Sequence, residues 1–130
     1  MEDFKDIWFV DDNEVFRFII KSLMEDSPYA SRMDFFDDGD RAMMRQIELS
    51  KNGNKGPKVI FLDLNMKYTD GWELLGLLNE LELEVNVVIL SSEDGVRAKA
   101  RAEQEPLVKG YLTKPIDQSE IEDLIVELVS

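Results

Sequence analysis

Two uninterrupted apolar runs constrain the fold of this chain more than any other feature of its sequence. Residues 58–63 read KVIFLD and residues 86–90 read NVVIL, with no alternation of polar and apolar side chains. A strand with one face in water alternates, whereas a strand covered on both faces is apolar throughout. Both runs therefore predict strands inside a parallel sheet that is covered by helices on each side.

Helical and extended patterns alternate along the rest of the chain. Further strands are expected at residues 6–11, 31–36 and 108–112. Helices are expected at about residues 13–25, 39–50, 71–83, 93–104 and 117–130. The last of these opens with Asp117 and Glu120, which resemble a capping box. Five strand–helix units predict an α/β fold with a parallel sheet and helices on both faces. No linker or repeat interrupts them, so residues 1–130 are expected to form one domain.

The composition excludes several kinds of site. The chain has neither cysteine nor histidine, which excludes disulfides, thiolate metal sites and a histidine general base. Its formal net charge of −13 argues against broad binding of nucleic acid or of anionic membranes. No apolar run approaches the roughly 20 residues of a membrane span. We therefore expect a cytoplasmic protein that contacts neither nucleic acid nor membrane.

Polar residues stand where the expected strands end. The first strand ends in Asp11 and Asp12, the third in Asp63 and the fourth in Ser91, and the fifth runs into Lys114. Any one of them alone would be ordinary at a strand end or as a helix N-cap. Open α/β sheets bind ligands outside the carboxyl ends of their strands, however, so together these side chains predict a site.

The residue types at this edge indicate phosphoryl chemistry. Three crowded carboxylates destabilise one another unless a cation joins them. Oxygen ligands suit Mg²⁺, or Mn²⁺ in its place. Lys114 and the Ser91 hydroxyl could then neutralise or hydrogen-bond the oxygens of a phosphoryl group. Asp63 is the candidate nucleophile, because carboxylates can form acyl phosphates.

With these residues placed, the chain resembles the receiver domains of two-component response regulators. The resemblance runs from IWFVDDNE through VIFLDLNM and DGWELL to VVILSSED and GYLTKPI, almost the whole length. It implies a flavodoxin-like (βα)5 three-layer sandwich whose five parallel strands follow the order 2-1-3-4-5. It also implies a signalling phosphoacceptor rather than an enzyme, with any self-catalysed reaction confined to Asp63. The protein is expected to be a stand-alone receiver, although the sequence does not exclude a piece of a longer chain.

The resemblance assigns roles to the acidic residues. Asp63 would accept a phosphoryl group from a histidine kinase or a histidine phosphotransfer protein, as in a phosphorelay. Asp12, Asp63 and the main-chain carbonyl of Asn65 would bind Mg²⁺ directly, whereas Asp11 would act largely through water. These assignments are carried over from the family onto the matching positions of this sequence.

The resemblance also assigns the residues that respond to the phosphoryl group. Ser91 matches the switch hydroxyl, Tyr111 the switch aromatic and Lys114 the lysine of the family. Pro115 matches the proline that usually follows a cis peptide bond. Movement of Ser91 would let Tyr111 turn inward, which would change the surface read by a downstream protein.

Two features depart from the family pattern. Receivers usually have proline at the position of Lys67, which is followed here by Tyr68. The loop KNGNKG also looks longer than usual. The first departure predicts a looser loop, or an added positive charge, beside the site.

Two surfaces are candidates for protein partners. The helix expected at residues 13–25 carries more apolar residues than one buried stripe needs, and Phe18 lies beyond that stripe. Rotation of the helix could bury Phe18; the alternative is a docking surface for the phosphodonor, formed by Val15, Phe18, Ile19 and Pro115. A local basic cluster could bind an acidic partner; it consists of Arg97, Lys99 and Arg101.

Three other readings use the same residues. A Mg²⁺-dependent phosphatase of the haloacid-dehalogenase type also has a strand-end Asp, but its second carboxylate stands where this chain has Asn65. A flavin-binding module shares the topology, but its first loop cradles a phosphate that DDNEVF would repel. A degenerate receiver that only binds partners would not need the complete set of site residues. We place the phosphorylated receiver ahead of all three.

Overall fold

Five parallel strands form the centre of the molecule in a computed structural model that describes residues 5–64, 66, 71–91 and 96–129. In chain order they are β1 (Ile7–Val10), β2 (Met33–Phe36), β3 (Val59–Asp63), β4 (Asn86–Ser91) and β5 (Val108–Thr113). Their order across the sheet is β2-β1-β3-β4-β5, and every neighbouring pair is parallel. This confirms the predicted topology.

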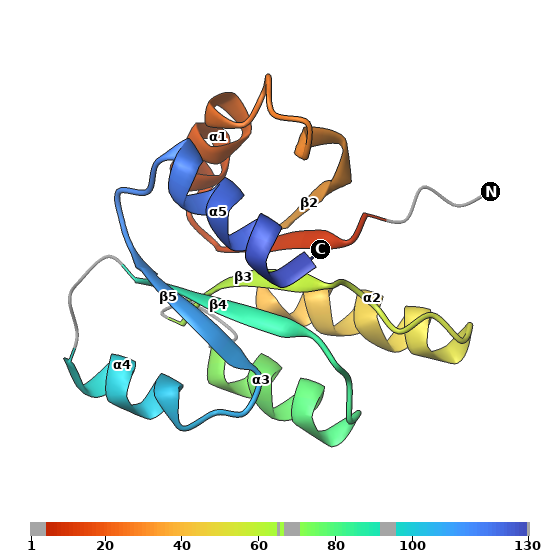
Figure 1. The fold of residues 1–130 in the computed structure, drawn as a ribbon. Helices are drawn as coiled ribbons and strands as arrows, with labels where there is room; N and C mark the ends of the chain where they lie inside the picture. The colour runs from red at the N-terminus through yellow and green to blue at the C-terminus, as the bar shows by residue number, and fades with distance from the viewer. Residues whose placement is uncertain (1–4, 65, 67–70, 92–95, 130) are drawn as a thin grey trace.

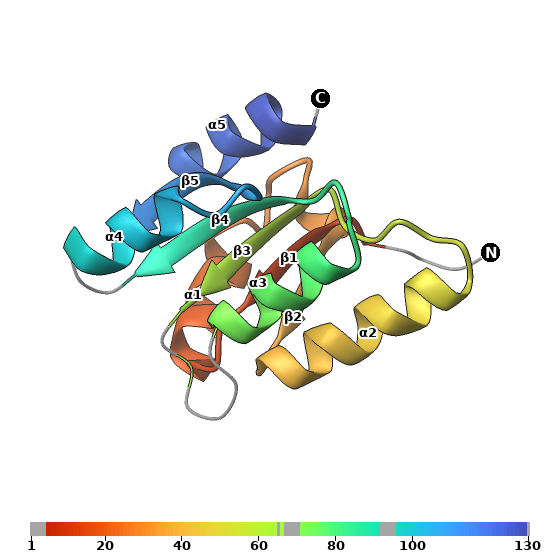
Figure 2. The same ribbon diagram turned by 90° about the horizontal axis from the view of Figure 1, so that it is seen from below.

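Helices cover both faces of the sheet. They are α1 (Glu14–Leu23), α2 (Gly39–Lys51), α3 (Gly71–Glu80), α4 (Val96–Glu103) and α5 (Gln118–Val129). Figure 1 shows α1 and α5 above the sheet and the other three helices below it, and Figure 2 shows the same layers from below. The three-layer arrangement is that of the flavodoxin-like fold. None of these helices combines the length and the apolar composition needed to cross a lipid bilayer.

The buried core is divided by the sheet into two parts. Trp8 and Val10 of β1 point to the side of α2, α3 and α4, whereas Ile7 and Phe9 point to the side of α1 and α5. This follows from the period of two in a strand, which sends successive side chains to opposite faces. Because both faces are covered, β1, β3 and β4 are apolar almost throughout, as their sequences predicted.

The ends of two helices are fixed by side chains that the sequence displays. Asn13 accepts a hydrogen bond from the Phe16 N–H at 3.0 Å and so caps α1. At α5, the Glu120 N–H donates to the Asp117 carboxylate at 2.8 Å and the Asp117 N–H donates to the Glu120 carboxylate at 3.1 Å. The predicted capping box of α5 is therefore confirmed. Helix α1 ends at Leu23, two residues earlier than expected.

Helix α2 differs from its sequence pattern. Of the apolar residues that indicated it, Ala42 and Leu49 are buried, whereas Met44 is 69% exposed. The buried position between them belongs to a polar residue, Gln46, whose side chain packs against Gly56 in the following loop. Gly56 has φ +90°, and a side chain there would collide with Gln46. The long loop is thus packed onto α2.

A short 3-10 helix that the sequence did not predict, η1 (Ala30–Arg32), leads into β2. Arg32 donates to both carboxylate oxygens of Asp6, at 3.0 and 2.7 Å. Burial raises the pKa of the Asp6 carboxyl, but the hydrogen bond and charge of Arg32 outweigh it, so the pKa lies below its ordinary value. The pair fastens the segment before β2 to the segment before β1.

Candidate functional site

The carboxyl ends of β1 and β3 bring the predicted acidic residues together. Val10 pairs with Leu62 across the two strands, so the residues that follow, Asp11 and Asp63, are neighbours. Asp11 is fully buried, Asp63 is 6% exposed and Asp12 is half-buried. Oxygens from the three carboxylates all lie within 4.8 Å of one another. The expected cluster is therefore present, and it is recessed rather than spread on the surface.

Lys114 offsets part of the repulsion within this cluster. Its Nζ donates to Oδ2 of Asp11 at 2.7 Å and lies 3.8 Å from Oδ2 of Asp63. Its main-chain N–H donates to the carbonyl oxygen of Ser91 at 2.7 Å, which ties the segment after β5 to the end of β4. Three carboxylates and one ammonium leave a formal charge of −2. That charge favours a divalent cation held by oxygen atoms.

The two adjacent aspartates differ in their surroundings. Both carboxylate oxygens of Asp11 already accept hydrogen bonds from the protein, Oδ2 from Lys114 and Oδ1 from the Asn13 N–H at 2.9 Å. The Asp11 carbonyl accepts a further bond from Nη1 of Arg17 at 2.7 Å. Asp12, but not Asp11, lines a surface cavity. Asp11 is therefore held as part of the framework, and Asp12 is presented to a ligand.

This cavity has a volume of about 520 Å³ and combines polar and apolar walls. Its polar residues are Asp12, Asn13, Asp63 and Lys114. Its apolar residues are Val15, Phe16, Ile19, Ile20, Pro115 and Ile116. The peptide bond between Lys114 and Pro115 is cis, as the family resemblance implied. One hollow thus joins two of the three clustered aspartates to part of the surface predicted to hold a phosphodonor.

Helix α1 presents its apolar residues to solvent as the docking hypothesis requires. Phe16 and Ile20 are buried against the sheet, whereas Phe18 is 68% exposed and Val15 and Ile19 are also exposed. The alternative explanation, that a rotated helix buries Phe18, is therefore wrong. Phe18 lies outside the cavity lining, on the adjoining surface of the same helix.

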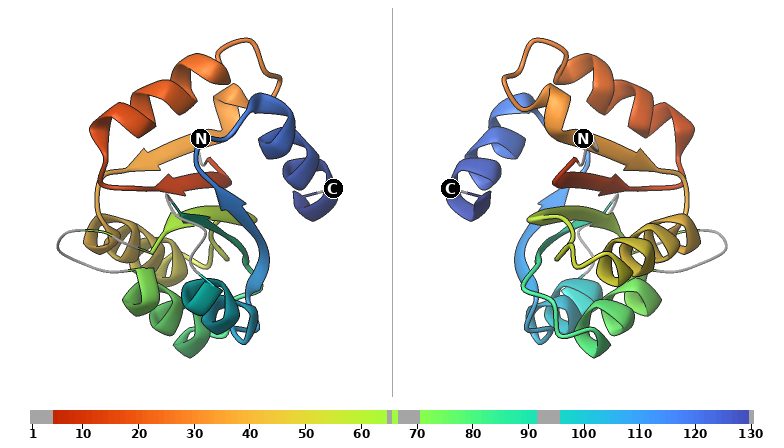
Figure 3. Two further views of the ribbon diagram at one scale, coloured as in Figure 1. Left: turned by 90° about the vertical axis from the view of Figure 1, so that its left-hand side faces the viewer. Right: turned by 90° about the vertical axis from the view of Figure 1, so that its right-hand side faces the viewer.

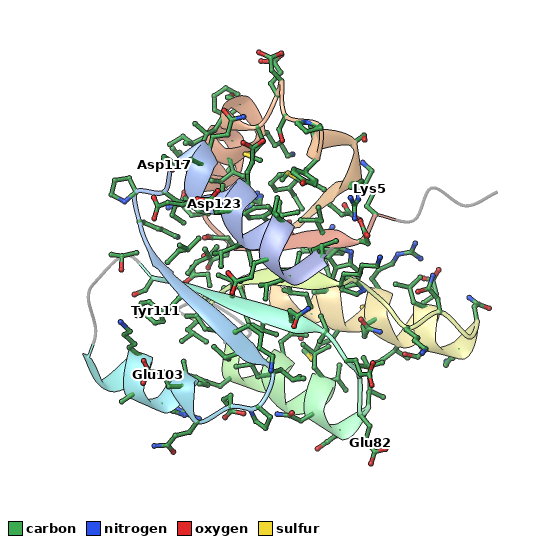
Figure 4. All side chains as sticks on the ribbon, viewed as in Figure 1. Lys5, Glu82, Glu103, Tyr111, Asp117 and Asp123 are labelled. Atoms are coloured by element: carbon green, nitrogen blue, oxygen red, sulfur yellow. The ribbon has the colours of Figure 1, made fainter. Side chains whose placement is uncertain are left out.

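The remaining predicted site residues are Ser91, Tyr111 and Asn65. Ser91, 5% exposed, ends β4 beside β3. Tyr111 pairs with Ile89 on the neighbouring strand, and its ring packs against the core on the side of α4 (Figure 4). Its hydroxyl is already buried, with no hydrogen-bond partner among the residues that the structure describes. Asn65, the expected carbonyl ligand, lies outside the described residues, as do Lys67 and Tyr68.

Two side chains of the predicted basic cluster on α4 contact aromatic rings. Nζ of Lys99 lies 5.7 Å from the ring centre of Tyr111, and the guanidinium of Arg101 lies 3.8 Å from that of Trp72. Both distances fall within the range of cation–π contacts. The side chain of Arg97 is outside the described part of the chain. Two of the three cations therefore hold α4 against α3 and β5.

Four residues that support the site were not identified from sequence. Arg17 and Asn13 orient Asp11, and the ring of Phe16 lies 4.0 Å from Nζ of Lys114. Their spacing after the acidic pair was visible, but their roles depend on how α1 packs. Gly71 is a fourth case: its N–H donates to the Leu64 carbonyl at 3.2 Å.

Gly71 brings α3 close to the chain that carries Asp63. A methyl group added at Gly71 would lie 2.8 Å from the Asp63 carbonyl oxygen and 2.9 Å from Cα of Leu64. We expect Gly71→Ala to lower the free energy of unfolding by about 1–3 kcal/mol, as overpacking commonly does. Gly76→Ala is the matched control, because no atom lies within 4 Å of the added group there. That control should stabilise α3 by up to about 1 kcal/mol. Urea unfolding of both variants measures this, and equal effects would contradict the close approach.

Fold and site together define a class of protein. A five-stranded parallel sheet of order 2-1-3-4-5, with clustered aspartates and a lysine at its carboxyl edge, is the arrangement of CheY-like receiver domains. The family model for the response regulator receiver domain matches residues 7–126. The chain therefore belongs to the response regulator receiver domain family, whose members are signalling domains rather than enzymes of the usual kind.

Individual relatives agree with this assignment. The probable methanogenesis regulatory protein FilR2 of Methanothrix harundinacea is 26% identical over 127 residues, which cover 94% of this chain and 79% of that protein. A two-component response regulator from Cytophaga hutchinsonii superimposes with a TM-score of 0.82 at 23% identity, covering 98% of both chains. The Mn²⁺-bound response regulator Rcp1 gives a TM-score of 0.71 at 22% identity, covering 93% of this chain and 88% of that one. At these identities the two structures show the shared fold.

Proposed function

We propose that this protein is a phosphoacceptor in a two-component system or phosphorelay, with Asp63 as the residue that is phosphorylated. The observation that carries the proposal is the position of Asp63 in a cavity that Asp12 and Lys114 also line. A nucleophile, an acidic residue for a cation and a positive charge thus face one space. The donor would be a histidine kinase or a histidine phosphotransfer protein.

The acidic residues fit a divalent cation. Mg²⁺ prefers oxygen ligands and keeps several waters, which suits a recessed group of three carboxylates of which two line a cavity. Asp12 and Asp63 would hold the ion, and Asp11 would support them through its contacts with Lys114 and Asn13. The bound ion would offset negative charge on the oxygens of the phosphoryl group during its transfer. Mn²⁺ could replace it, since the similar fold of Rcp1 is known with Mn²⁺.

The residues of the chain have separate tasks in the transfer. A carboxylate oxygen of Asp63 attacks phosphorus, and the bond between phosphorus and the imidazole nitrogen of the donor breaks. Lys114 lies between Asp11 and Asp63 and offsets the negative charge of the phosphoryl oxygens. Ser91, buried at the end of the neighbouring strand, donates a hydrogen bond to one of those oxygens. The product is an aspartyl phosphate on Asp63.

The alternatives need features that this site does not offer. A haloacid-dehalogenase phosphatase needs a second carboxylate at position 65, where this chain has asparagine. A flavin module needs a phosphate cradle after its first strand, but here Asp11 and Asp12 stand there. A degenerate receiver would have lost part of the constellation, whereas Asp11, Asp12, Asp63 and Lys114 all meet.

Phosphorylation would be reported through Ser91 and Tyr111. A phosphoryl group adds about −1.5 to −2 charges and strong acceptor oxygens. The hydrogen bond from Ser91 would draw the end of β4 toward Asp63. The family resemblance implied that Tyr111 turns inward at this step, and in this structure its hydroxyl is already buried. The proposal is therefore that phosphorylation fixes Tyr111 inward and changes the surface of α4, β5 and α5.

A Ser91→Ala variant tests this coupling. We expect the wild-type protein, labelled with fluorotyrosine, to show a ¹⁹F NMR shift for Tyr111 on phosphorylation, because the donated hydrogen bond moves β4 against β5. Ser91→Ala should lose most of that shift. Thr113→Ala is the control, since Thr113 pairs with Ser91 across β4 and β5 but is exposed. A full shift in Ser91→Ala would contradict the coupling.

The phosphodonor would dock on α1 and on the segment after β5. Val15, Ile19 and Pro115 line the same cavity as Asp63, and Phe18 extends the apolar surface beside it. A partner histidine must come within bonding distance of Asp63, so apolar contacts at the rim would hold it there. Docking of a phosphodonor would account for the exposed apolar side chains of α1, which core packing does not explain.

Phe18→Glu or Ile19→Glu should slow phosphotransfer from the cognate protein donor. A charge buried at such a contact commonly costs about 2 kcal/mol or more, so the rate should fall roughly tenfold or more. Labelling by acetyl phosphate should be nearly unchanged, because a small donor does not need the apolar rim. Met44→Glu is the matched control, as Met44 is equally exposed but lies on α2. Equal losses with both donors would show that the site itself was damaged.

A further inference from the structure

We propose that the open edge of β2 binds an extended acidic peptide from a partner protein. This surface is separate from the cavity at Asp63, and the proposal does not depend on phosphorylation. It starts from the position of β2 at the margin of the sheet, beside β1 only (Figure 3). Edge strands are sites at which another chain can add a strand.

Two adjacent hollows follow this edge. One, of about 340 Å³, is lined by Lys5, Lys21, Met24, Ala30, Met33, Asp34 and Phe35. The other, of about 360 Å³, is lined by Arg17, Lys21, Phe35, Phe36, Asp37 and Arg41. Lys21 and Phe35 line both, so the two hollows are neighbours along the strand. A row of hollows along a strand fits an extended ligand better than a compact one.

The charge of this edge is opposite to that of the rest of the protein. Four basic residues line the two hollows against two acidic ones, Asp34 and Asp37. The whole chain has 15 basic and 28 acidic residues, about the reverse ratio. An acidic ligand would be repelled by most of this molecule and attracted here. Charge complementarity therefore selects the acidic side chains of the peptide.

The main contacts of these cations leave room for a ligand. Lys21 is exposed, with its Nζ 4.9 Å from the ring centre of Phe35, and Lys5 is also exposed. Arg17 and Arg41 already contact the protein, through the Asp11 carbonyl and the Asp37 carboxylate at 3.2 Å. The two lysines are thus the principal candidates to bind carboxylates.

The apolar part of the peptide would rest on the floor of the hollows. Met24 and Met33 are buried there, and Phe35 and Phe36 are half-buried. Phe35 stacks on Phe9 of β1, whereas the ring of Phe36 is tilted against Trp8. The Phe36 carbonyl accepts from the Asp11 N–H at 3.1 Å, so Phe36 faces β1. Main-chain groups alternate in direction along a strand, so those of Phe35 face away from β1. Its N–H donates to the Asp34 carboxylate at 3.0 Å, a local contact that an added strand would replace.

Cations at an edge strand can also protect it from pairing. That explanation is weaker here, because cations on an acidic protein attract rather than repel further copies of it. A second copy is the competing occupant, and its binding would make the protein dimerise. Measurements of peptide binding and of the oligomeric state distinguish a bound peptide from a second copy.

The test uses fluorescein-labelled acetyl-(Val-Glu)₄-amide and the full chain, with anisotropy to measure affinity and ¹⁵N NMR to locate binding. We expect saturable binding that weakens with salt, with the largest shifts at the amides of β2 and the end of α1. Lys21→Glu should weaken it about tenfold, and Lys5→Glu should do the same if the first variant is poorly folded. Lys109→Glu, an exposed lysine on the opposite edge strand, should leave it unchanged.

Three results would overturn the proposal. One is the absence of selective binding, seen either as no binding or as equal binding of acetyl-(Val-Lys)₄-amide. Another is equal affinity for a peptide N-methylated at alternate residues, because strand addition needs its main-chain N–H groups. The third is a dimer in sedimentation experiments that Lys21→Glu dissociates, which would assign the edge to a second copy.

Discussion

Asp63→Asn is expected to take up no phosphate from acetyl phosphate or from a phosphorylated donor protein, while keeping its fold. Asparagine has the shape of aspartate but cannot form an acyl phosphate. The change also removes one of three carboxylates whose oxygens lie within 4.8 Å of one another. Without Mg²⁺, the free energy of unfolding should be equal or higher, by up to about 1 kcal/mol, since lost attraction to Lys114 offsets part of the relieved repulsion.

The control is Asp37→Asn, which removes an exposed carboxylate that pairs with Arg41 away from the cavity. It should be phosphorylated like the wild type. Urea unfolding and intact mass after incubation measure both properties in the same samples. A stable phosphate adduct on Asp63→Asn would show that another residue is the acceptor.

Asp12→Ala is expected to weaken divalent-cation binding more than Asp11→Ala does. Asp12 lines the cavity, whereas both oxygens of Asp11 already accept bonds from Lys114 and Asn13. Loss of a supporting residue around a metal commonly costs 10–100-fold in affinity, and loss of a direct ligand costs more. We therefore expect Asp11→Ala to lower the affinity for the cation about tenfold, and Asp12→Ala to lower it further. Electron paramagnetic resonance of unbound Mn²⁺ measures both.

The two variants should also differ in stability, in the opposite order. Asp11→Ala leaves the mostly buried ammonium of Lys114 without its partner at 2.7 Å, and breaking such pairs is strongly destabilising. Asp12→Ala removes a half-buried carboxylate at the cavity wall and should change the free energy of unfolding little. Equal losses of Mn²⁺ binding in the two variants would contradict the separate roles assigned here.

Much of the site could be predicted because strand ends are visible in the sequence. Asp11, Asp12, Asp63 and Ser91 each follow an uninterrupted apolar run, and parallel strands bring their carboxyl ends to one edge. Lys114 follows a strand that is less apolar, but the same strand-end argument placed it at this edge. The structure brings Lys114 to the carboxylates, as expected.

Other features could not be predicted because they depend on packing between elements. Helical spacing placed Phe18 beyond the buried stripe of α1, but did not show whether a rotation would bury it. On α2 the same reasoning could not anticipate that Met44 is exposed while polar Gln46 is buried under Gly56. The position of Gly71 against Asp63 likewise arises from how α3 returns to the sheet.

The most direct test of phosphoacceptance is the intact mass of the wild-type protein after incubation with Mg²⁺ and acetyl phosphate. The proposed site predicts the addition of one phosphoryl group. The addition should require Mg²⁺, and chelation of Mg²⁺ before the incubation should prevent it. Peptide mapping after borohydride reduction of the acyl phosphate should place it on Asp63. An unchanged mass under conditions that phosphorylate a related receiver, or a phosphoryl group on any other residue, would contradict the proposed function.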